Sequence, residues 1–211
     1  MTPDIFAEWF RRQGQRVIQT ASSYWVETVP HVFQAFPYHW VISPSDNELT
    51  ELLKAYNGVV LRYSTPLNVA LGSISYHVVY ESSDYDIHNL GKWARKNVRR
   101  GLSRCQVEPI SFERLAHEGF ELQIDTLARQ GRKLNLAKES WQMLCMTAGE
   151  LPGFEAWGAL VQGRLAASVI TFQMENFGYM LYQQCHHDDS TAKTSRQILS
   201  EYPPQNGQTL M

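Results

Sequence analysis

The stretch AWGALVQGRLAASVITFQMENFGYMLYQQCH (residues 156–186) decides the fold of this chain. It contains three apolar runs rich in β-branched and aromatic residues, and two short turn-like breaks separate them. The runs cover residues 156–162, 165–173 and 179–186, and the breaks fall at 163–164 and 176–178. This spacing predicts a three-stranded antiparallel meander.

The segments around the meander predict one strand and three helices. A short strand is expected over 106–110, and Ser111 is a suitable N-cap for a helix to about residue 129. Further helices are expected over 138–148 and 191–202. From residue 106 the predicted order is therefore β-α-α-β-β-β-α. The residues expected on the buried side of the first helix are Leu115, Phe120, Ile124 and Leu127.

The first 85 residues predict shorter elements with many aromatic side chains. Apolar periodicity favours helices over 4–12 and 46–56, and Ser45 with Glu48 forms a capping box before the second. Short extended pieces and strands are expected within 23–43, over 59–63 and over 72–81.

Composition bounds the class of protein. The chain has 211 residues, 44% of them hydrophobic, and a formal net charge of −2. Such a chain can bury a large core in one large domain or two small lobes. Its three cysteines lie far apart, which favours reduced thiols. No signal-peptide pattern and no apolar run of about 20 residues is present, so we expect a cytoplasmic protein without a membrane span.

A basic segment, KWARKNVRRGLSR (92–104), carries six positive charges and no negative one. The charges recur with helical spacing beside an apolar row of Ala94, Val98 and Leu102. One interpretation is an anion-binding helix; the other is a solvated face that pairs with nearby acids. The acids considered for such pairing are Glu81, Asp84, Asp86 and Glu108.

The polar run that begins at Cys185 and ends at Asp189 invites a metal interpretation. Neighbouring residues of a strand point to opposite faces, and no second ligand pair occurs at a recognisable spacing. We therefore expect no metal site.

The chain resembles the GNAT acyltransferase superfamily, and more specifically its Fem-like (FemA/FemB-type) branch. The stretches that carry the resemblance are VVLRY (59–63), WARKNVRRGLSRCQVEPI (93–110), LARQGR (127–132) and RLAASVITF (164–172). The resemblance implies an α+β fold: a GNAT-like lobe whose mostly antiparallel central sheet is flanked by helices, preceded by a smaller partial GNAT-like lobe. The corresponding domains are 1–85 and 86–211, with the basic helix over 86–104.

The resemblance also implies an N-acyltransferase that moves an acyl or aminoacyl group from a thioester or ester carrier to an amine. Acyl-CoA or an aminoacyl-tRNA would be the co-substrate, with no tightly bound cofactor, and the acceptor an anionic small molecule or cell-envelope precursor. The implied substrate-binding residues are Lys96, Arg99, Arg100, Arg129 and Arg132. The implied carrier contacts are Ser190, Thr191, Lys193 and Thr194, and the catalytic candidates are Gln184 and His186.

Two departures from the family pattern support an alternative. The expected carrier loop, 186–193, has no glycine and contains Asp188 and Asp189, which would repel a pyrophosphate. The tail after residue 202 is short and polar, so we expect a truncated chain whose fourth strand is an exposed edge prone to self-association. The alternative is thus an inactive protein that binds a protein or nucleic acid through its basic helix, although the net charge disfavours nucleic acid.

Overall fold

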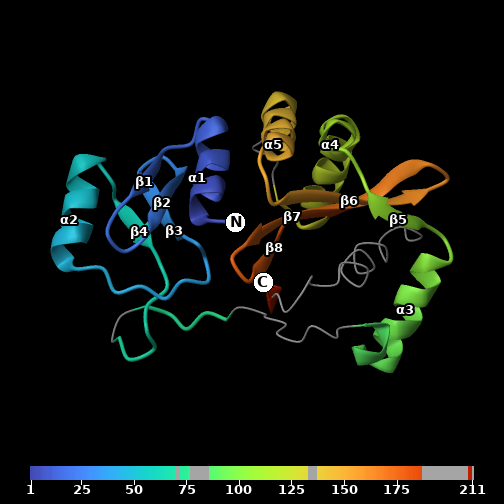
Figure 1. Ribbon diagram of the computed structural model, residues 1–211, viewed down its shortest axis with the longest axis horizontal. Coiled ribbons are helices and arrows are strands. Elements are labelled where there is room, and N and C mark those ends of the chain that lie inside the picture. Colours follow the sequence, from blue (N-terminus) through green and yellow to red (C-terminus); the bar gives the residue numbers. More distant parts are fainter. Residues whose placement is uncertain (70–71, 77–85, 133–136, 187–208, 211) are drawn as a thin grey trace. The chain divides into compact units, whose positions relative to one another are not determined.

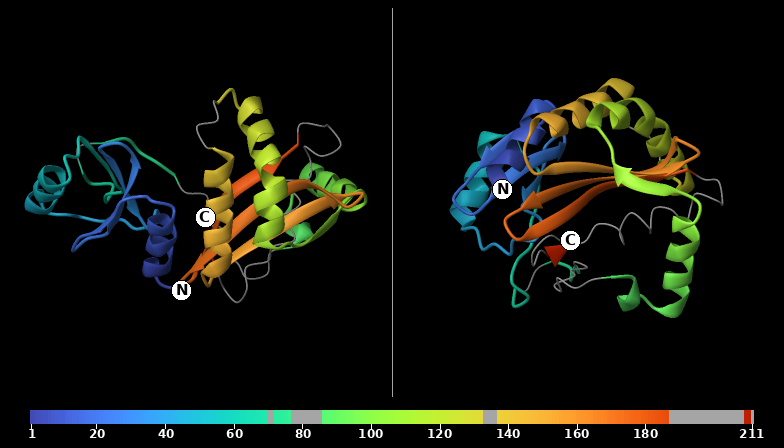
Figure 2. Two further views of the ribbon diagram at one scale, coloured as in Figure 1. Left: turned by 90° about the horizontal axis from the view of Figure 1, so that it is seen from above. Right: turned by 45° about the vertical axis from the view of Figure 1, so that its right-hand side comes forward.

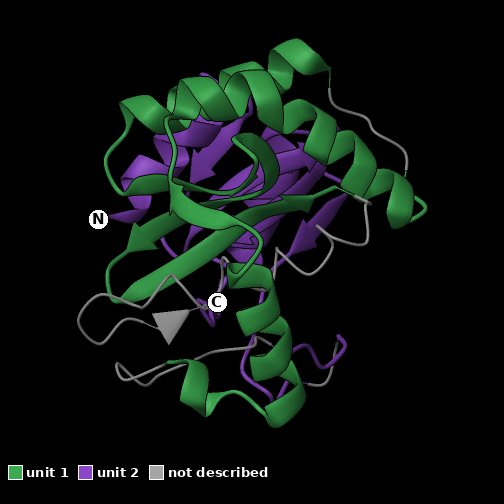
Figure 3. Ribbon diagram, turned by 90° about the vertical axis from the view of Figure 1, so that its right-hand side faces the viewer, with its two compact units in different colours: residues 1, 79–211 green, residues 2–78 purple. Residues whose placement is uncertain are grey.

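The computed structural model describes residues 1–69, 72–76, 86–132, 137–186 and 209–210 (Figure 1). The chain divides into two compact units, one formed by residues 2–78 and the other by residue 1 with residues 79–211 (Figure 3). Each unit has its own sheet. The domain boundary at residue 85 stays a prediction.

The N-terminal unit is a four-stranded sheet with two helices. Its strand order is β1-β2-β3-β4, in which β4 runs parallel to β3 and the other neighbours are antiparallel. The elements are α1 (Pro3–Arg12), β1 (Val17–Gln19), β2 (Tyr24–Val29), β3 (Val32–Phe36), α2 (Asp46–Ala55) and β4 (Val60–Arg62).

The side chains of neighbouring residues of β2 lie on opposite faces of this sheet. Tyr24 stacks on Phe36, which also meets Phe6 and Phe10 of α1. The next residue, Trp25, is fully buried in a separate cluster that includes Leu52 of α2. Alternation along the strand therefore gives each helix its own side of the core.

The second unit is a five-stranded sheet of order β5-β6-β7-β8-β9. Its first four strands are antiparallel neighbours, and α4 and α5 cover one face while α3 lies on the other side (Figure 2). The elements are η1 (Ile87–Asn89), α3 (Lys92–Leu102), β5 (Gln106–Pro109), α4 (Phe112–Arg129), α5 (Lys138–Glu150), β6 (Phe154–Val161), β7 (Arg164–Met174), β8 (Phe177–Cys185) and β9 (Thr209–Leu210). The predicted α+β class and antiparallel meander are confirmed.

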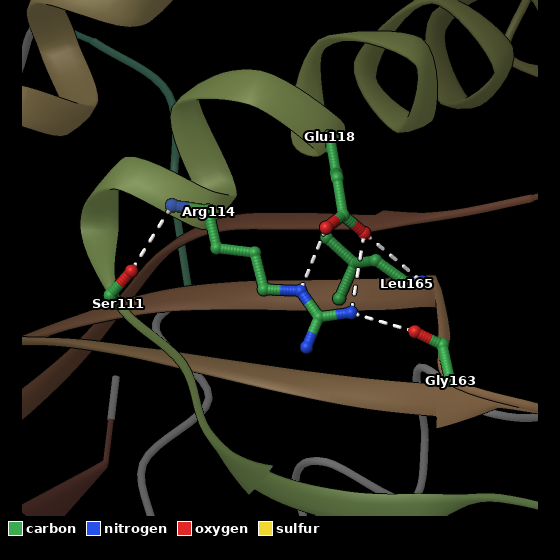
Figure 4. Close-up of polar contacts among 5 residues, drawn as sticks. All are labelled: Ser111, Arg114, Glu118, Gly163 and Leu165. Carbon is green, nitrogen blue, oxygen red and sulfur yellow. Dashed lines mark hydrogen bonds and ion pairs between the residues drawn. The ribbon is translucent and has the colours of Figure 1, made fainter.

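A polar clasp fastens the β6–β7 turn to α4 (Figure 4). Arg114 donates to the carbonyl of Gly163 at 2.8 Å and to Glu118, whose carboxylate accepts the backbone N–H of Leu165 at 3.4 Å. The Ser111 hydroxyl accepts from the backbone N–H of Arg114, as the predicted N-cap requires. The first two turns of α4 thus set the position of the hairpin that leads into β7.

Several expectations need correction. The segment 72–76 is not a strand, although 72–81 alternates: Ile74 and Tyr76 are 71% and 86% exposed, and no described strand pairs with them. Residues 77–81 lie outside the described residues. The basic helix begins at Lys92 rather than residue 86, because Asp86 caps the separate 3-10 turn η1. Ile124 is 37% exposed and not part of the buried side of α4.

The tail also differs from expectation. It supplies a short fifth strand, β9, which pairs in parallel with Phe177 and Gly178. Backbone pairing does not depend on apolar side chains, so the polar composition of the tail was a poor guide. Among the described residues, the outer side of β8 therefore has a strand partner at Phe177 and Gly178, and the predicted self-association stays a prediction. The predicted helix over 191–202 lies outside the described residues.

Candidate functional site

The outer edge of β8 is the first feature of the site. Beyond Gly178 no described strand pairs with β8 on the side away from β7. The backbone N–H of Cys185 donates to the Thr126 hydroxyl at 3.0 Å, so it points away from β7. Backbone groups two residues apart on a strand share a direction, so the N–H of Gln183 points outward as well.

A β-bulge lies in the same stretch. Tyr182 pairs with Ile170 and Met180 pairs with Thr171, so Leu181 is the extra residue of β8. A bulge bends its strand, increases the local twist and re-aims the backbone. Between Gly178 and Cys185, the described part of β8 therefore has a bent outer edge at which the backbone N–H of Gln183 points outward.

The end of β8 is held by polar groups of α4. The Thr126 hydroxyl and the Arg129 guanidinium both donate to the carbonyl of Cys185, at 3.2 and 2.8 Å. The next residue, His186, places Nδ1 3.4 Å from Oδ2 of Asp125. His186 is 37% exposed and Asp125 25%, so an imidazole with a carboxylate partner stands at the end of the outer edge.

Gln184 lies inside the molecule, between the sheet and α4. Its side chain is 1% exposed; its Oε1 accepts from the Ser168 hydroxyl at 2.9 Å and its Nε2 donates to Gln123 at 2.8 Å. Both ends of the amide are thus used within the core. Its catalytic role stays a prediction.

The predicted substrate-binding cations fall into two groups that lie apart. Lys96, Arg99 and Arg100 are on α3, which leads into β5, and β6 and β7 separate β5 from β8. Arg129 and Arg132 lie at and after the end of α4. Besides its contact with β8, Arg129 complements the C-terminal end of the α4 dipole. Among the described candidates, Arg129 and His186 thus lie at the same end of β8, Arg129 through its bond to Cys185 and His186 as the next residue.

The candidate carrier contacts, Ser190, Thr191, Lys193 and Thr194, lie outside the described residues. Within the described residues, no group of three His, Cys, Asp or Glu side chains lies close enough to hold a metal ion. The absence of a metal stays a prediction.

Sequence reasoning missed the residues of α4 that build the end of β8. Asp125 and Thr126 are separated from His186 by a helix and three strands, and nothing in the local pattern links them. The only signal was the spacing of Asp125 and Arg129, which places both on one side of α4.

A shallow groove of about 460 Å³ lies beside α2 and β1 in the N-terminal unit. One of its polar residues, Glu48, accepts from the backbone N–H and the hydroxyl of Ser22 at 3.1 and 2.6 Å. Partial burial alone would raise the pKa of Glu48, but the hydrogen bonds from Ser22 and Thr20 outweigh it and hold the pKa below its ordinary value. These contacts are all internal, so the groove is not a candidate site.

Comparison with solved structures shows the fold of the chain. It is similar to FemX, with a TM-score of 0.63 and 11% identity over 98% of this chain and 81% of that one. It is also similar to the C-terminal domain assigned to a lysylphosphatidylglycerol synthetase of Agrobacterium fabrum, with a TM-score of 0.62 and 11% identity over 99% of this chain and 75% of that one. L-PGS from Bacillus licheniformis matches with a TM-score of 0.51 and 12% identity, over 99% of this chain and 74% of that one.

These likenesses confirm the predicted GNAT-like, Fem-like fold. No protein-family model matches the chain, and no curated protein matches it in sequence. None of the helices in the described residues has the length and apolar character that crossing a bilayer requires.

Proposed function

We propose that this chain is an N-acyltransferase that transfers an acyl or aminoacyl group from a thioester or ester carrier to an amine. The observation that carries the proposal is the bent outer edge of β8 between Gly178 and Cys185. The likeness of fold to FemX supports it. Acyl-CoA or an aminoacyl-tRNA is the proposed donor, and Ser190, Thr191, Lys193 and Thr194 are its proposed contacts.

The edge suits the chemistry of acyl transfer because the carbonyl oxygen of the donor gains negative charge when an amine attacks. A fixed backbone N–H, such as that of Gln183, stabilises this charge without reorganisation. A bond forms between the amine nitrogen and the carbonyl carbon, and the bond from that carbon to the carrier sulfur or oxygen breaks. The carrier leaves as a thiol or alcohol after it takes up a proton.

His186 is the proposed acceptor of the amine proton. Histidine is the side chain that most often serves as a general base, and the Asp125 carboxylate, 3.4 Å from Nδ1, orients the ring. The proton passes from the amine to His186 and then to the leaving group. The proposed acceptor is an anionic small molecule or envelope precursor. Lys96, Arg99 and Arg100 are its proposed contacts, and because they lie apart from β8 they would hold a part of the acceptor remote from the reacting amine.

The experiment measures release of free thiol from a panel of acyl-CoA thioesters, with and without amine acceptors, and release of the amino acid from aminoacyl-tRNA in parallel. We expect acceptor-dependent release with one donor class. His186→Gln should lower kcat about 100-fold or more, as is typical for loss of a general base. His88→Gln, which changes an exposed histidine of η1, is the matched control and should retain activity.

Failure of every donor in this panel would refute the acyl-transfer proposal. Equal activity of the two histidine variants would instead remove His186 from the mechanism. For the acceptor site, replacing Arg99 and Arg100 by alanine should abolish acceptor binding with an almost unchanged thermal midpoint; an equal loss of stability would assign both residues to folding.

A further inference from the structure

One face of α3 concentrates positive charge in solvent. Lys92, Lys96, Arg99 and Arg100 are all exposed, and the helical repeat of 3.6 residues places them on the same side of the helix. Arg104 follows in the turn after the helix and is exposed too. At a rise of about 1.5 Å per residue, the charged face extends over about 18 Å. We call these five residues the basic face.

The described residues do not neutralise the basic face. Arg11, Arg12, Arg16 and Arg114 each form an ion pair with a glutamate, whereas no ion pair among the described residues includes a cation of the basic face. Two acidic residues close to α3 in the sequence make hydrogen bonds with other groups. Asp86 caps η1, and the carboxylate of Glu108 accepts from the side-chain amide of Gln106. Among the residues that the structure describes, the basic face therefore has no ion-pair partner.

The length of the basic face favours an extended anion. A single phosphate or carboxylate contacts one or two such cations, because each bond requires about 3 Å between heavy atoms. Five cations along about 18 Å instead match a surface that carries many negative charges.

Aromatic and apolar side chains distinguish between the extended anions. Trp93 is 67% exposed and lies beside Lys96 and Arg100, three and seven residues further along the helix. Tryptophan favours the headgroup region of a bilayer, where its ring is partly apolar and its N–H remains hydrated. Leu102, on the same helix, is 37% exposed. Aliphatic side chains gain from contact with lipid but gain little from the phosphates of a nucleic acid.

We propose that the surface of an anionic lipid bilayer is the partner of the basic face. The cations contact the lipid headgroups, and the Trp93 ring enters the interfacial layer. Val98 and Gly101, on the opposite side of α3, are buried, so the helix lies on the bilayer as part of the folded protein rather than inserting its apolar side. Lys96, Arg99 and Arg100 are also the proposed acceptor contacts, so a bilayer and a soluble acceptor would compete for them; binding to the bilayer does not itself depend on acyl transfer.

The experiment is sedimentation of the full chain with vesicles of phosphatidylcholine alone and with vesicles that also contain phosphatidylglycerol. We expect binding only to the anionic vesicles, and less binding as salt shortens the Debye length. The double variant Lys96→Gln/Arg100→Gln should bind about thirty-fold more weakly, from the contribution of two cations near an anionic surface. The control Lys138→Gln/Arg164→Gln makes the same change of net charge at exposed positions outside α3 and should bind normally.

Fluorescence tests the place of the aromatic ring. Anionic vesicles should shift the tryptophan emission of the native chain to shorter wavelength, and the shift should disappear in Trp93→Phe. Absence of sedimentation with anionic vesicles at low salt overturns the proposal, and so does an equal loss in the control variant. Binding to a single-stranded RNA in the same salt series, without binding to vesicles, would overturn it in favour of a nucleic acid.

Discussion

Replacing Gln184 by alanine should destabilise the protein strongly, because the side chain joins β7, β8 and α4 inside the core. The substitution removes hydrogen bonds to Ser168 and Gln123. Each contributes about 1 kcal/mol, and a buried donor or acceptor that loses its partner costs as much or more. The buried methylene lost from the side chain adds about 0.8 kcal/mol.

The total is a loss of about 3 kcal/mol in the free energy of unfolding, which corresponds to roughly 6–12 °C in Tm for a chain of this size. Urea unfolding and calorimetry of the full chain measure both quantities. The matched control is Gln183→Ala, which changes the same residue type at the exposed neighbouring position and should shift stability by less than about 0.5 kcal/mol.

The comparison of the two variants also tests the role of Gln184. If both variants are equally stable, the argument from buried hydrogen bonds is wrong. If Gln184→Ala keeps its stability but loses acyl transfer, the amide contacts the reacting groups and is catalytic. Loss of stability together with loss of activity is the result that the structure supports.

Two further predictions concern packing and pH. A Cβ at Gly119 would lie 2.7 Å from Leu115 Cδ1 and 3.0 Å from Trp141 Cζ2. Overpacking of this kind costs about 1–3 kcal/mol, and the higher helix propensity of alanine returns about 1 kcal/mol, so Gly119→Ala should lower the free energy of unfolding in urea by about 1 kcal/mol. An equally stable variant would contradict this close approach of α4 and α5. Burial, with a hydrogen bond to Asp4, raises the pKa of Tyr24 from 10.0 to about 12. The folded state then holds this proton more tightly, so its contribution to stability is complete below pH 10.0 and is lost as the pH rises to about 12. Tyr24→Phe should therefore lose stability less steeply than the native chain over that range, and parallel slopes in pH-dependent unfolding would show that Tyr24 titrates normally.

Local signals in the sequence predicted most of the helices, because a helix is stabilised largely by residues near one another in the chain. Ser45 and Ser111 do cap α2 and α4, with their hydroxyls accepting from the N–H groups of Glu48 and Arg114. The predicted positions of the two turns of the meander differ from the observed ones by one or two residues. Gln162 and Glu175 adopt positive φ angles of 52°, which non-glycine residues seldom do, so their part in the two turns could not be predicted from residue type.

Long-range contacts account for what the sequence did not predict. The alternation of 72–76 is a strand pattern, but a strand needs a neighbour, and the pattern does not say whether one exists. His186 was a candidate from its chemistry alone, while its partner Asp125 becomes visible only once α4 lies on the sheet. Gln184 was a candidate for the opposite reason. The sequence shows a polar residue on a strand, but it does not show whether the side chain faces a ligand or packs against a helix.

The division of β2 between two helices constrains how this protein can evolve. The side chains of Tyr24 and Trp25 lie on different faces of the sheet. Inserting or deleting one residue in the strand would turn each side chain to the opposite face, where it would meet the other helix. Substitutions that preserve size can accumulate there, but changes of length cannot. We expect insertions and deletions among descendants of this sequence to collect in the turns instead, for example between α1 and β1.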